Sequence, residues 1–583
     1  MIVVGSGAGG GTTGFVLAVH GVKVLMLEAG RWYEPHTETP MFQLPKDAPL
    51  RAAGTVDKPF GFYDATVDGG WRVPGEPYTS AEGTNFLWYR ARMLGGRTNH
   101  WGRISLRAGP YDFKPYSRDG LGFDWPITYD DLAPYYDKAE MYVGVYGTNE
   151  GLENTPDSPP GVLLPPPKMR AFEHLTKRTC DRLGMPVIPA HVAVLSETQD
   201  ADRMPQRIFP GNPFAQQVTR QAMQARSPCF WATNCGRGCA IAATYQSPTY
   251  HVAPARYTGN LDVVTNAMVR EVTVDSAGRA TGVHYIDKRT REDHHVSARV
   301  VVLAASACES ARILLNSKSS QFPDGLANGS GLVGKYLMDT VGAGVSGQIP
   351  ALENLPPHNE EGASMIHTYM PWWLYGEQSR GQLDFARGYH VEFGGGRQMP
   401  GYGAFGGMEP LTGGSYGRQF KADCRRYYGS FMWFDGRGEM IPNEESYCEI
   451  DPDTVDQWGI PVLRFQWKWS DHELNMAAHM QRTFAGIIED MGGQVLSTVQ
   501  TDGAKAILAP GQIIHEVGGV RMGDDPSNSV LNEWCQAWEV PNLFVTDGGA
   551  FVTNPDKNCT LTIMALAWRA SDYIVEQLRS EGL

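Results

Sequence analysis

Two short segments of this sequence contain residue types at a spacing that could bind a cofactor or a metal cluster. The first is Gly5-Ser6-Gly7-Ala8-Gly9-Gly10, a G-x-G-x-x-G pattern directly after an apolar run. In such a pattern Gly5 permits a tight turn, Gly7 lets backbone N–H groups approach a pyrophosphate, and Gly10 lets a helix pack on a strand. Glu28 lies 18 residues after Gly10, close to the roughly 20 expected for an acid that binds a ribose. The segment predicts a dinucleotide site, and it leaves open whether FAD or NAD binds there.

The second segment contains three cysteines with the spacing C-x5-C-x3-C, namely Cys229, Cys235 and Cys239. Three thiolates on a glycine-containing loop can hold an iron–sulfur cluster. Structural or free cysteines and a disulfide remain open as alternatives. Zinc is disfavoured because it expects four ligands, and no neighbouring histidine completes the set. The total of nine cysteines in 583 residues is too few for a disulfide scaffold.

The spacing of apolar residues predicts the strands and the helix that must position the glycine motif. Residues 1–4 and 22–28 are typical of strands, and residues 12–20 are typical of a helix between them. The clearest helix of the chain covers 471–492, with Asp471 as its N-cap and a glycine after its end. Further strands are expected at 261–264, 270–275 and 299–305, followed by a helix at 308–315.

Composition and charge exclude several classes of protein. Hydrophobic residues make up 42% of the chain and charged residues 20%, as in a folded globular protein of about three to five domain-sized units. The formal charge of −14 disfavours nucleic acid and anionic membrane as partners. No apolar run approaches the ~18 residues of a membrane helix, so direct membrane insertion is not expected. Because no signal pattern precedes the glycine motif, any secretory signal is expected to be absent or already removed.

Four further segments carry a family resemblance. Residues 94–103 read LGGRTNHWGR, residues 515–523 HEVGGVRMG, residues 541–548 PNLFVTDG and residues 558–567 NCTLTIMALA. Together with the N-terminal unit they resemble the glucose–methanol–choline (GMC) oxidoreductase family of FAD enzymes, in the family's order along the chain. Within that family the segments look closest to the catalytic subunits of bacterial D-glucoside 3-dehydrogenases, with pyranose oxidase as a relative.

The resemblance implies an α/β fold, α+β overall, with two discontinuous domains. A Rossmann-like FAD-binding domain would gather residues 1–125, 225–335 and 500–583. A substrate-binding domain, built on an antiparallel sheet with helices, would comprise residues 126–224 and 336–499. Within it, the Gly- and aromatic-rich segment 362–420 suits strands and loops over a sugar site. Residues 434–445 are polar and aromatic enough to touch a sugar, although a solvated loop has the same composition.

The resemblance also assigns catalytic roles. Oxidation of an alcohol by a flavin needs a base for the hydroxyl proton while hydride leaves for flavin N5. The family pattern maps the base onto His515, whose residue type has an unperturbed pKa of ~6.5. Asn558 would orient the substrate oxygen by a hydrogen bond without competing for the proton.

The cofactor contacts implied by the resemblance spread over the whole chain. Asp547 matches the family residue near the ribityl chain, and the residue matching Val269 meets the adenine through its backbone. Thr560 and the helix that it opens would face flavin O2. His100 stands where some family members attach FAD covalently through a histidine. Other members keep a histidine there without the bond, so covalent attachment of FAD to His100 is left open. The full set of expected contacts is Gly5, Gly7, Gly10, Glu28, Gly96, Asn99, His100, Trp101, Val269, Ala305, Asp547 and Thr560.

The function expected from these residues is that of an FAD-dependent sugar or glycoside dehydrogenase acting at a secondary ring hydroxyl, with C3 of a glucoside favoured. The alternatives are an oxygen-using pyranose or glycoside oxidase and a non-catalytic flavoprotein electron carrier, which has no need of a base such as His515. Similar cysteine spacing occurs in GMC dehydrogenases that carry a three-iron cluster, which makes a cytochrome c acceptor and a small helper subunit expected partners. The location stays open between the cytoplasm and the bacterial periplasm, reached with a signal-bearing partner.

Overall fold

A five-stranded parallel sheet has at its centre the strand that leads into the N-terminal glycine motif. In this computed structural model, residues 1–39, 41, 47, 68–231, 235–356, 366–397, 408–580 and 582–583 are described. Three distant parts of the chain contribute strands, and all three residues of the central strand are buried, as expected where helices and loops cover both faces of a parallel sheet. In spatial order the strands are β19 (Leu543–Val545), β11 (Val301–Leu303), β1 (Ile2–Val4), β2 (Val24–Glu28) and β7 (Leu261–Thr265).

The predicted βαβ unit is present, with one shifted boundary. Helix α1 (Ala8–Val19) begins four residues before the expected Thr12, because the glycines after Gly7 already have helical backbone geometry. Helix α16 (Thr560–Arg579) packs on α1. Helix α10 (Ala307–Asn316) follows β11, as predicted from 308–315.

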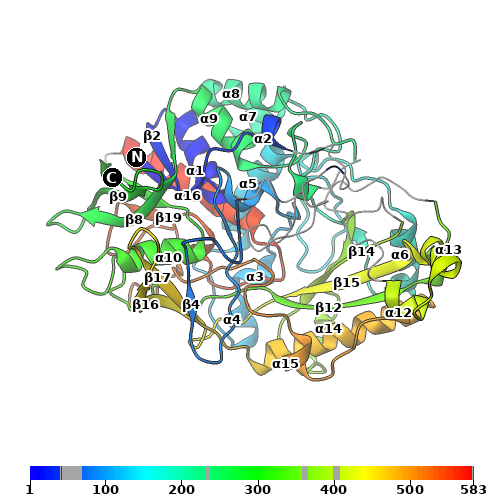
Figure 1. Cartoon of the computed structure of the whole chain (residues 1–583). Coiled ribbons are helices and arrows are strands. Elements are labelled where there is room, and N and C mark those ends of the chain that lie inside the picture. The colour runs from blue at the N-terminus through cyan, green and yellow to red at the C-terminus, as the bar shows by residue number, and fades with distance from the viewer. Residues whose placement is uncertain are drawn as a thin grey trace.

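A six-stranded antiparallel sheet forms the second large layer of the molecule. Helix α14 (Asp471–Asp490) lies along one face of it, against β12 and β15 (Figure 1). Side chains in β15 alternate between buried and half-buried, and the buried Phe434 and Gly436 face α14. The strand order is β18 (Gln494–Val495), β12 (Val341–Gln348), β15 (Phe431–Gly438), β14 (Tyr389–Gly395), β13 (Thr368–Met370) and β6 (Ile188–Pro189).

The expected N-cap of α14 is wrong by one residue. Ser470 is the N-cap, and its backbone N–H donates to the Glu473 carboxylate at 2.7 Å. The Ser470 hydroxyl bonds to the same carboxylate, and the pair forms a capping box. Asp471 is instead the first helical residue, where its negative charge still favours the helix N-terminus.

Smaller sheets and short helices complete the described structure. One antiparallel sheet contains β8 (Ala267–Val274), β9 (Ala280–Asp287) and β10 (Asp293–Ser297). The strand predicted at 270–275 corresponds to β8, which begins three residues earlier and ends one residue earlier. The predicted segment 362–420 contributes β13 and β14, whereas its residues 362–365 and 398–407 lie outside the described residues. In the described ranges no helix has both the length and the apolar character to cross a membrane. The remaining elements are α2 (Pro35–Glu38), β3 (Gly69–Gly70), β4 (Thr79–Ser80), β5 (Arg90–Ala91), α3 (Pro110–Phe113), α4 (Pro115–Asp119), α5 (Tyr129–Val143), α6 (Ala171–Arg182), α7 (Met204–Ile208), α8 (Pro213–Gln224), α9 (Ala253–Tyr257), α11 (Tyr375–Ser379), α12 (Glu409–Thr412), α13 (Gly417–Tyr427), β16 (Tyr447–Val455), β17 (Pro461–Gln466) and α15 (Gly503–Ala506).

Candidate active site

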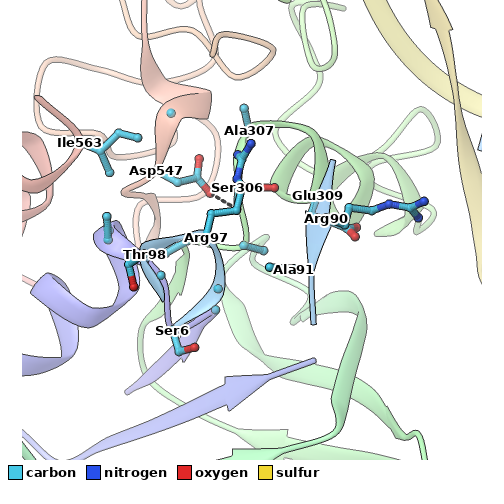
Figure 2. A pocket seen from close by; sticks show the side chains of 18 of the residues that line it. Ser6, Arg90, Ala91, Arg97, Thr98, Ser306, Ala307, Glu309, Asp547 and Ile563 are labelled. Carbon is cyan, nitrogen blue, oxygen red and sulfur yellow. Dashed lines mark hydrogen bonds between the residues drawn. The ribbon is translucent and has the colours of Figure 1, made fainter. Parts of the chain in front are cut away.

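A cavity of about 350 Å³ opens at the carboxyl ends of β1, β2, β11 and β19. This edge of a parallel sheet is where open α/β folds bind their ligands. Its walls come from the glycine loop, residues 89–104, the start of β8, the loop after β11, residues 513–516 and the start of α16. Figure 2 shows several of these walls converging on one space.

Two glycines, Gly7 and Gly96, expose backbone without side chains to this cavity. A Cβ built on Gly7 would meet no atom within 4 Å, and one built on Gly96 would meet only the Gly7 Cα, at 3.9 Å. Gly5 has φ +96°, and a Cβ there would lie 2.3 Å from the Ala304 carbonyl oxygen, so only glycine fits. Because α1 begins at Ala8, its N-terminus points at the same space. This cradle fits a pyrophosphate.

Ten of the expected cofactor residues line the cavity, and two lie behind its wall. A Cβ on Gly10 would be 2.0 Å from the Gly5 carbonyl oxygen, which explains the glycine there by helix–strand packing. The Asn99 amide donates to the carbonyl oxygens of Leu94 (2.8 Å) and Gly96 (3.1 Å), and so holds the turn that carries Gly96. The residues that line the cavity are Gly5, Gly7, Glu28, Gly96, His100, Trp101, Val269, Ala305, Asp547 and Thr560.

Glu28 ties the glycine loop to its surroundings. Its carboxylate accepts hydrogen bonds from the backbone N–H groups of Ser6 (3.1 Å) and Gly30 (2.6 Å). The Ser6 hydroxyl also bonds to Glu28 and accepts from the Gly95 N–H at 2.8 Å. Burial raises the pKa of Glu28 and these bonds oppose the rise. The network fixes the relative position of the two glycine turns.

Asp547 is held at the opposite wall by three donors. One carboxylate oxygen accepts from the Ser306 backbone N–H (3.0 Å, dashed in Figure 2) and from the Ser310 hydroxyl (2.6 Å). The other accepts from the Gly549 N–H at 2.8 Å. Asp547 therefore has a fixed orientation at the cavity wall, and its predicted contact with the ribityl chain stays a prediction.

Arg97 is a cavity residue that the sequence did not single out. Its guanidinium forms an ion pair with Glu516, donates to the Ile514 carbonyl oxygen at 3.1 Å, and projects along the cavity in Figure 2. Arg97 thereby ties the LGGRTNHWGR segment to residues 514–516. Its place inside that motif was the available signal, but the partner lies more than 400 residues away.

His515 stands at the cavity as a neutral imidazole. Its Nδ1 lies 3.1 Å from Thr340 Oγ1, and its backbone N–H donates to Asp339 at 2.9 Å. Burial of the ring, reinforced by the nearby Arg437 charge, lowers the pKa of His515 to about 3. A neutral imidazole has a lone pair on one nitrogen, which is what a general base requires.

Asn558 lies on the same cavity and is oriented by the antiparallel sheet. Its Nδ2 donates to Glu392 Oε1 at 3.2 Å, and Glu392 Oε2 pairs with Arg437 at 3.2 Å. Burial alone would raise the pKa of Glu392, but the Arg437 charge and the bonds from His390 and Asn558 lower it well below its usual range. Because an ionised carboxylate only accepts hydrogen bonds, the Asn558 atom that faces it must be the amide nitrogen. The structure thus brings His515 and Asn558 to one cavity.

His100 and Trp101 line the cavity side by side. Burial, followed by the charges of Arg103 and Arg97, lowers the pKa of His100 to about 3, so its ring is neutral. His100 Nδ1 is buried and makes no hydrogen bond with the described residues. The Trp101 indole N–H donates to the Tyr245 carbonyl oxygen at 3.1 Å and fixes the ring at the wall.

The three clustered cysteines lie away from the cavity lining. Cys229 accepts from the Trp231 N–H at 3.3 Å, and Cys239 accepts from the Ala243 N–H at 3.2 Å. All three are free thiols, so the disulfide alternative does not hold in the structure. Burial and the neighbouring Cys235 raise the pKa of the Cys229 thiol to about 12.

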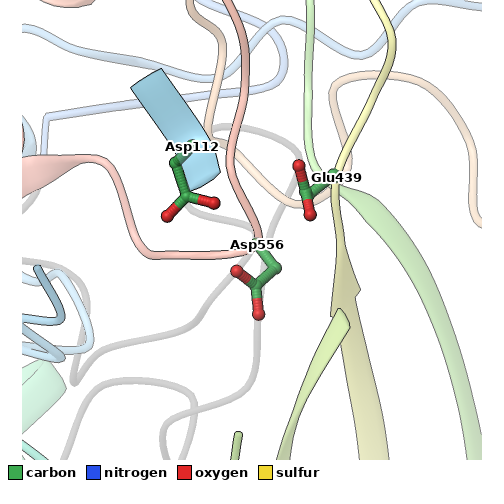
Figure 3. A group of neighbouring side chains, drawn as sticks. All are labelled: Asp112, Glu439 and Asp556. Atoms are coloured by element: carbon green, nitrogen blue, oxygen red, sulfur yellow. The ribbon is translucent and has the colours of Figure 1, made fainter. Parts of the chain in front are cut away.

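Three acidic side chains meet at the segment that leads to Asn558. Figure 3 shows Asp112, Glu439 and Asp556 pointing toward one another from three separate segments. Lys557 pairs with Asp112 (3.4 Å) and with Asp556, so an internal cation already neutralises part of this cluster. These ion pairs anchor the segment that leads to Asn558, and the Asp556 carbonyl oxygen also contacts His390 in β14.

Comparison with known proteins decides the family. The family models described as GMC oxidoreductase match residues 212–340 and 442–567. The chain is 30% identical to 2-methyl-1,2-propanediol dehydrogenase of Mycolicibacterium austroafricanum, over 98% of this chain and 94% of that protein. The chain belongs to the GMC oxidoreductase family. The predicted membership, and with it an FAD-dependent oxidoreductase acting on CH–OH groups, is therefore confirmed.

Other relatives agree with this assignment. The large subunit of fructose dehydrogenase from Gluconobacter japonicus is 26% identical over 99% of this chain and 98% of its own. A pyranose 2-oxidase is also a relative, over 28% of the chain, as the resemblance predicted. Among solved structures, pyridoxine 4-oxidase from Mesorbium loti has a TM-score of 0.61 at 14% identity, with 98% of each chain covered. That likeness confirms the predicted GMC fold.

Proposed function

We propose that this GMC oxidoreductase is a dehydrogenase of sugars or glycosides. It oxidises a secondary ring hydroxyl, with C3 of a glucoside as the favoured position, and passes electrons to an external acceptor. One observation carries the proposal: His515 and Asn558 face the same cavity as the glycine cradle built by Gly7 and Gly96. We assign residues 1–125, 225–335 and 500–583 to the FAD-binding domain and residues 126–224 and 336–499 to the substrate-binding domain.

The chain's own residues supply the proton chemistry. Bound FAD supplies the hydride acceptor. With Nδ1–H donated to Thr340, the lone pair of His515 lies on Nε2 and accepts the proton of the substrate hydroxyl. Asn558, held by Glu392, orients the substrate oxygen. The N-terminus of α16 at Thr560 adds partial positive charge to the same wall.

The route for electrons is proposed to leave through the cysteine loop. Cys229, Cys235 and Cys239 are close enough for the two other thiols to raise the pKa of the Cys229 thiol, and we propose that they hold a three-iron cluster. A cytochrome c acceptor and a small helper subunit are the partners that this route requires. The name of the fructose dehydrogenase relative, a large subunit, supports a multi-subunit assembly.

Three measurements test the proposed function. Anaerobic addition of a glucoside should bleach the flavin absorbance, and the product should be a 3-keto glucoside. Turnover with an artificial acceptor should exceed turnover with oxygen. Flavin that no sugar or glycoside reduces would leave a non-catalytic carrier, and faster turnover with oxygen would favour the oxidase alternative.

A further inference from the structure

One polar face of the six-stranded sheet borders the cavity wall near His515. In β15, Asp435 and Arg437 are on the face opposite α14, because their neighbours Phe434 and Gly436 point to that helix. On the adjacent β12, a Cβ added to Gly342 would lie 2.6 Å from Ile513, which lines the cavity. The face that carries Asp435 and Arg437 therefore packs against the cavity wall beside His515.

The strand register gives Asp435 a built position on this face. Asp435 is paired with Gly344 on one side and with Glu392 on the other. A Cβ added to Gly344 would lie 2.0 Å from Asp435 Oδ1, so the glycine makes room for this carboxylate. The Asp435 side chain is 37% exposed, and its one ion pair with a described residue, Arg437, is long at 3.9 Å. No described residue donates a hydrogen bond to it.

The positive charges near His515 are paired with other carboxylates and leave the negative charge of Asp435 without a close partner. Arg437 is already paired more closely with Glu392, at 3.2 Å, and Arg97 is paired with Glu516. His515 is neutral. Asp435 is not in the cavity lining but lies beside it, because it pairs with Glu392, which in turn holds Asn558. Among the described residues of this sheet face, Asp435 is thus the half-exposed charge that lacks a close partner. Its carboxylate accepts hydrogen bonds from hydroxyl or ammonium groups and repels another carboxylate.

We propose that Asp435 is a specificity-determining residue that binds a substrate hydroxyl or ammonium group remote from the reacting carbon. The site accordingly accepts neutral polyols and amino sugars and rejects sugar acids. This inference rests on the proposed function, because it assumes that the cavity takes a sugar.

The test compares three substrates that share one ring: glucose, glucosamine and glucuronate. For the flavin-loaded enzyme with a saturating artificial acceptor, we expect kcat/KM for glucuronate to be at least about tenfold below that for glucose. Asp435→Asn should raise the glucuronate-to-glucose ratio about tenfold and lower the glucosamine-to-glucose ratio. Asp435→Glu, which keeps the charge, should retain the wild-type order.

Glu489→Gln is the matched control, since it removes one carboxylate from an exposed position of α14, on the other side of the sheet. It should leave all three ratios unchanged. Equal ratios in wild type and Asp435→Asn would overturn the proposal. If no sugar reduced the flavin, the proposed function would fail, and binding of the same three sugars, followed by the flavin absorbance of the holoenzyme, would still decide the charge preference.

Discussion

The hydrogen bond between Thr340 and His515 offers a sensitive test of the proposed base. Replacing Thr340 with Val keeps the shape of the side chain and removes the Oγ1 atom that lies 3.1 Å from His515 Nδ1. A typical hydrogen bond contributes about 0.5–1.5 kcal/mol net. If the bond sets which nitrogen carries the proton, its loss should slow flavin reduction about 2- to 13-fold, at 1.36 kcal/mol per factor of ten.

Anaerobic stopped-flow measurement of flavin reduction by a glucoside isolates this step from reoxidation. Thr340→Ser retains a hydroxyl and should stay close to wild type, so the Val-to-Ser comparison separates the hydrogen bond from packing. Flavin content should not change in either variant, because Thr340 does not line the cavity. Equal rates in the Val variant, the Ser variant and the wild type would refute the role assigned to Thr340.

Four further outcomes follow from the site. His515→Ala should slow flavin reduction by about 10²–10⁴ and Asn558→Ala by less, while FAD stays bound; a wild-type reduction rate in His515→Ala would place the base elsewhere. Because burial and Arg437 lower the pKa of His515 to about 3, the base is neutral above that value and the reduction rate should be flat between about pH 5 and 8. Arg437→Gln should raise this pKa and move the acid limb of the pH profile to higher pH, and an acid limb moved to lower pH would contradict the electrostatic argument. Cys229→Ser should lower the iron content and slow transfer to an external acceptor without slowing flavin reduction, whereas anaerobically purified wild type without iron would count against a cluster.

The parts of the site that the sequence predicted are those whose residues act within one short segment. The glycine loop between β1 and α1 is an example, since Gly5, Gly7 and Gly10 each meet a requirement set by neighbours in the same turn or by the adjoining strand. Element ends were less exact. Ser470, and not the expected Asp471, is the N-cap because it forms a capping box with Glu473. In this box each side chain hydrogen-bonds to the backbone N–H of the other residue.

The parts that could not be predicted depend on pairing between distant strands. Glu392 reaches Asn558 and Arg437 only because β14 pairs with β15 in one register, and a one-residue slip would turn Glu392 to the opposite face. The alternation of charged residues and glycines over 435–438 was the available signal, but it does not name the partner strand. The spacing of the three cysteines likewise gives their order along the chain and not the distances between their sulfur atoms.

The order of strands in the parallel sheet also determines how late in synthesis the cofactor site is complete. Strand β1 sits between β2 and β11, and the sheet is completed by β19, which starts at Leu543. At a synthesis rate of about 5–20 residues per second, β1 waits roughly half a minute to two minutes for β19 and α16 to be made. The far wall of the cavity, with Asp547 and Thr560, does not exist before then. Cofactor binding at a complete site is therefore expected only late in the synthesis of each chain. A polypeptide that ends near residue 500 lacks Asp547 and Thr560, and with them part of the flavin site.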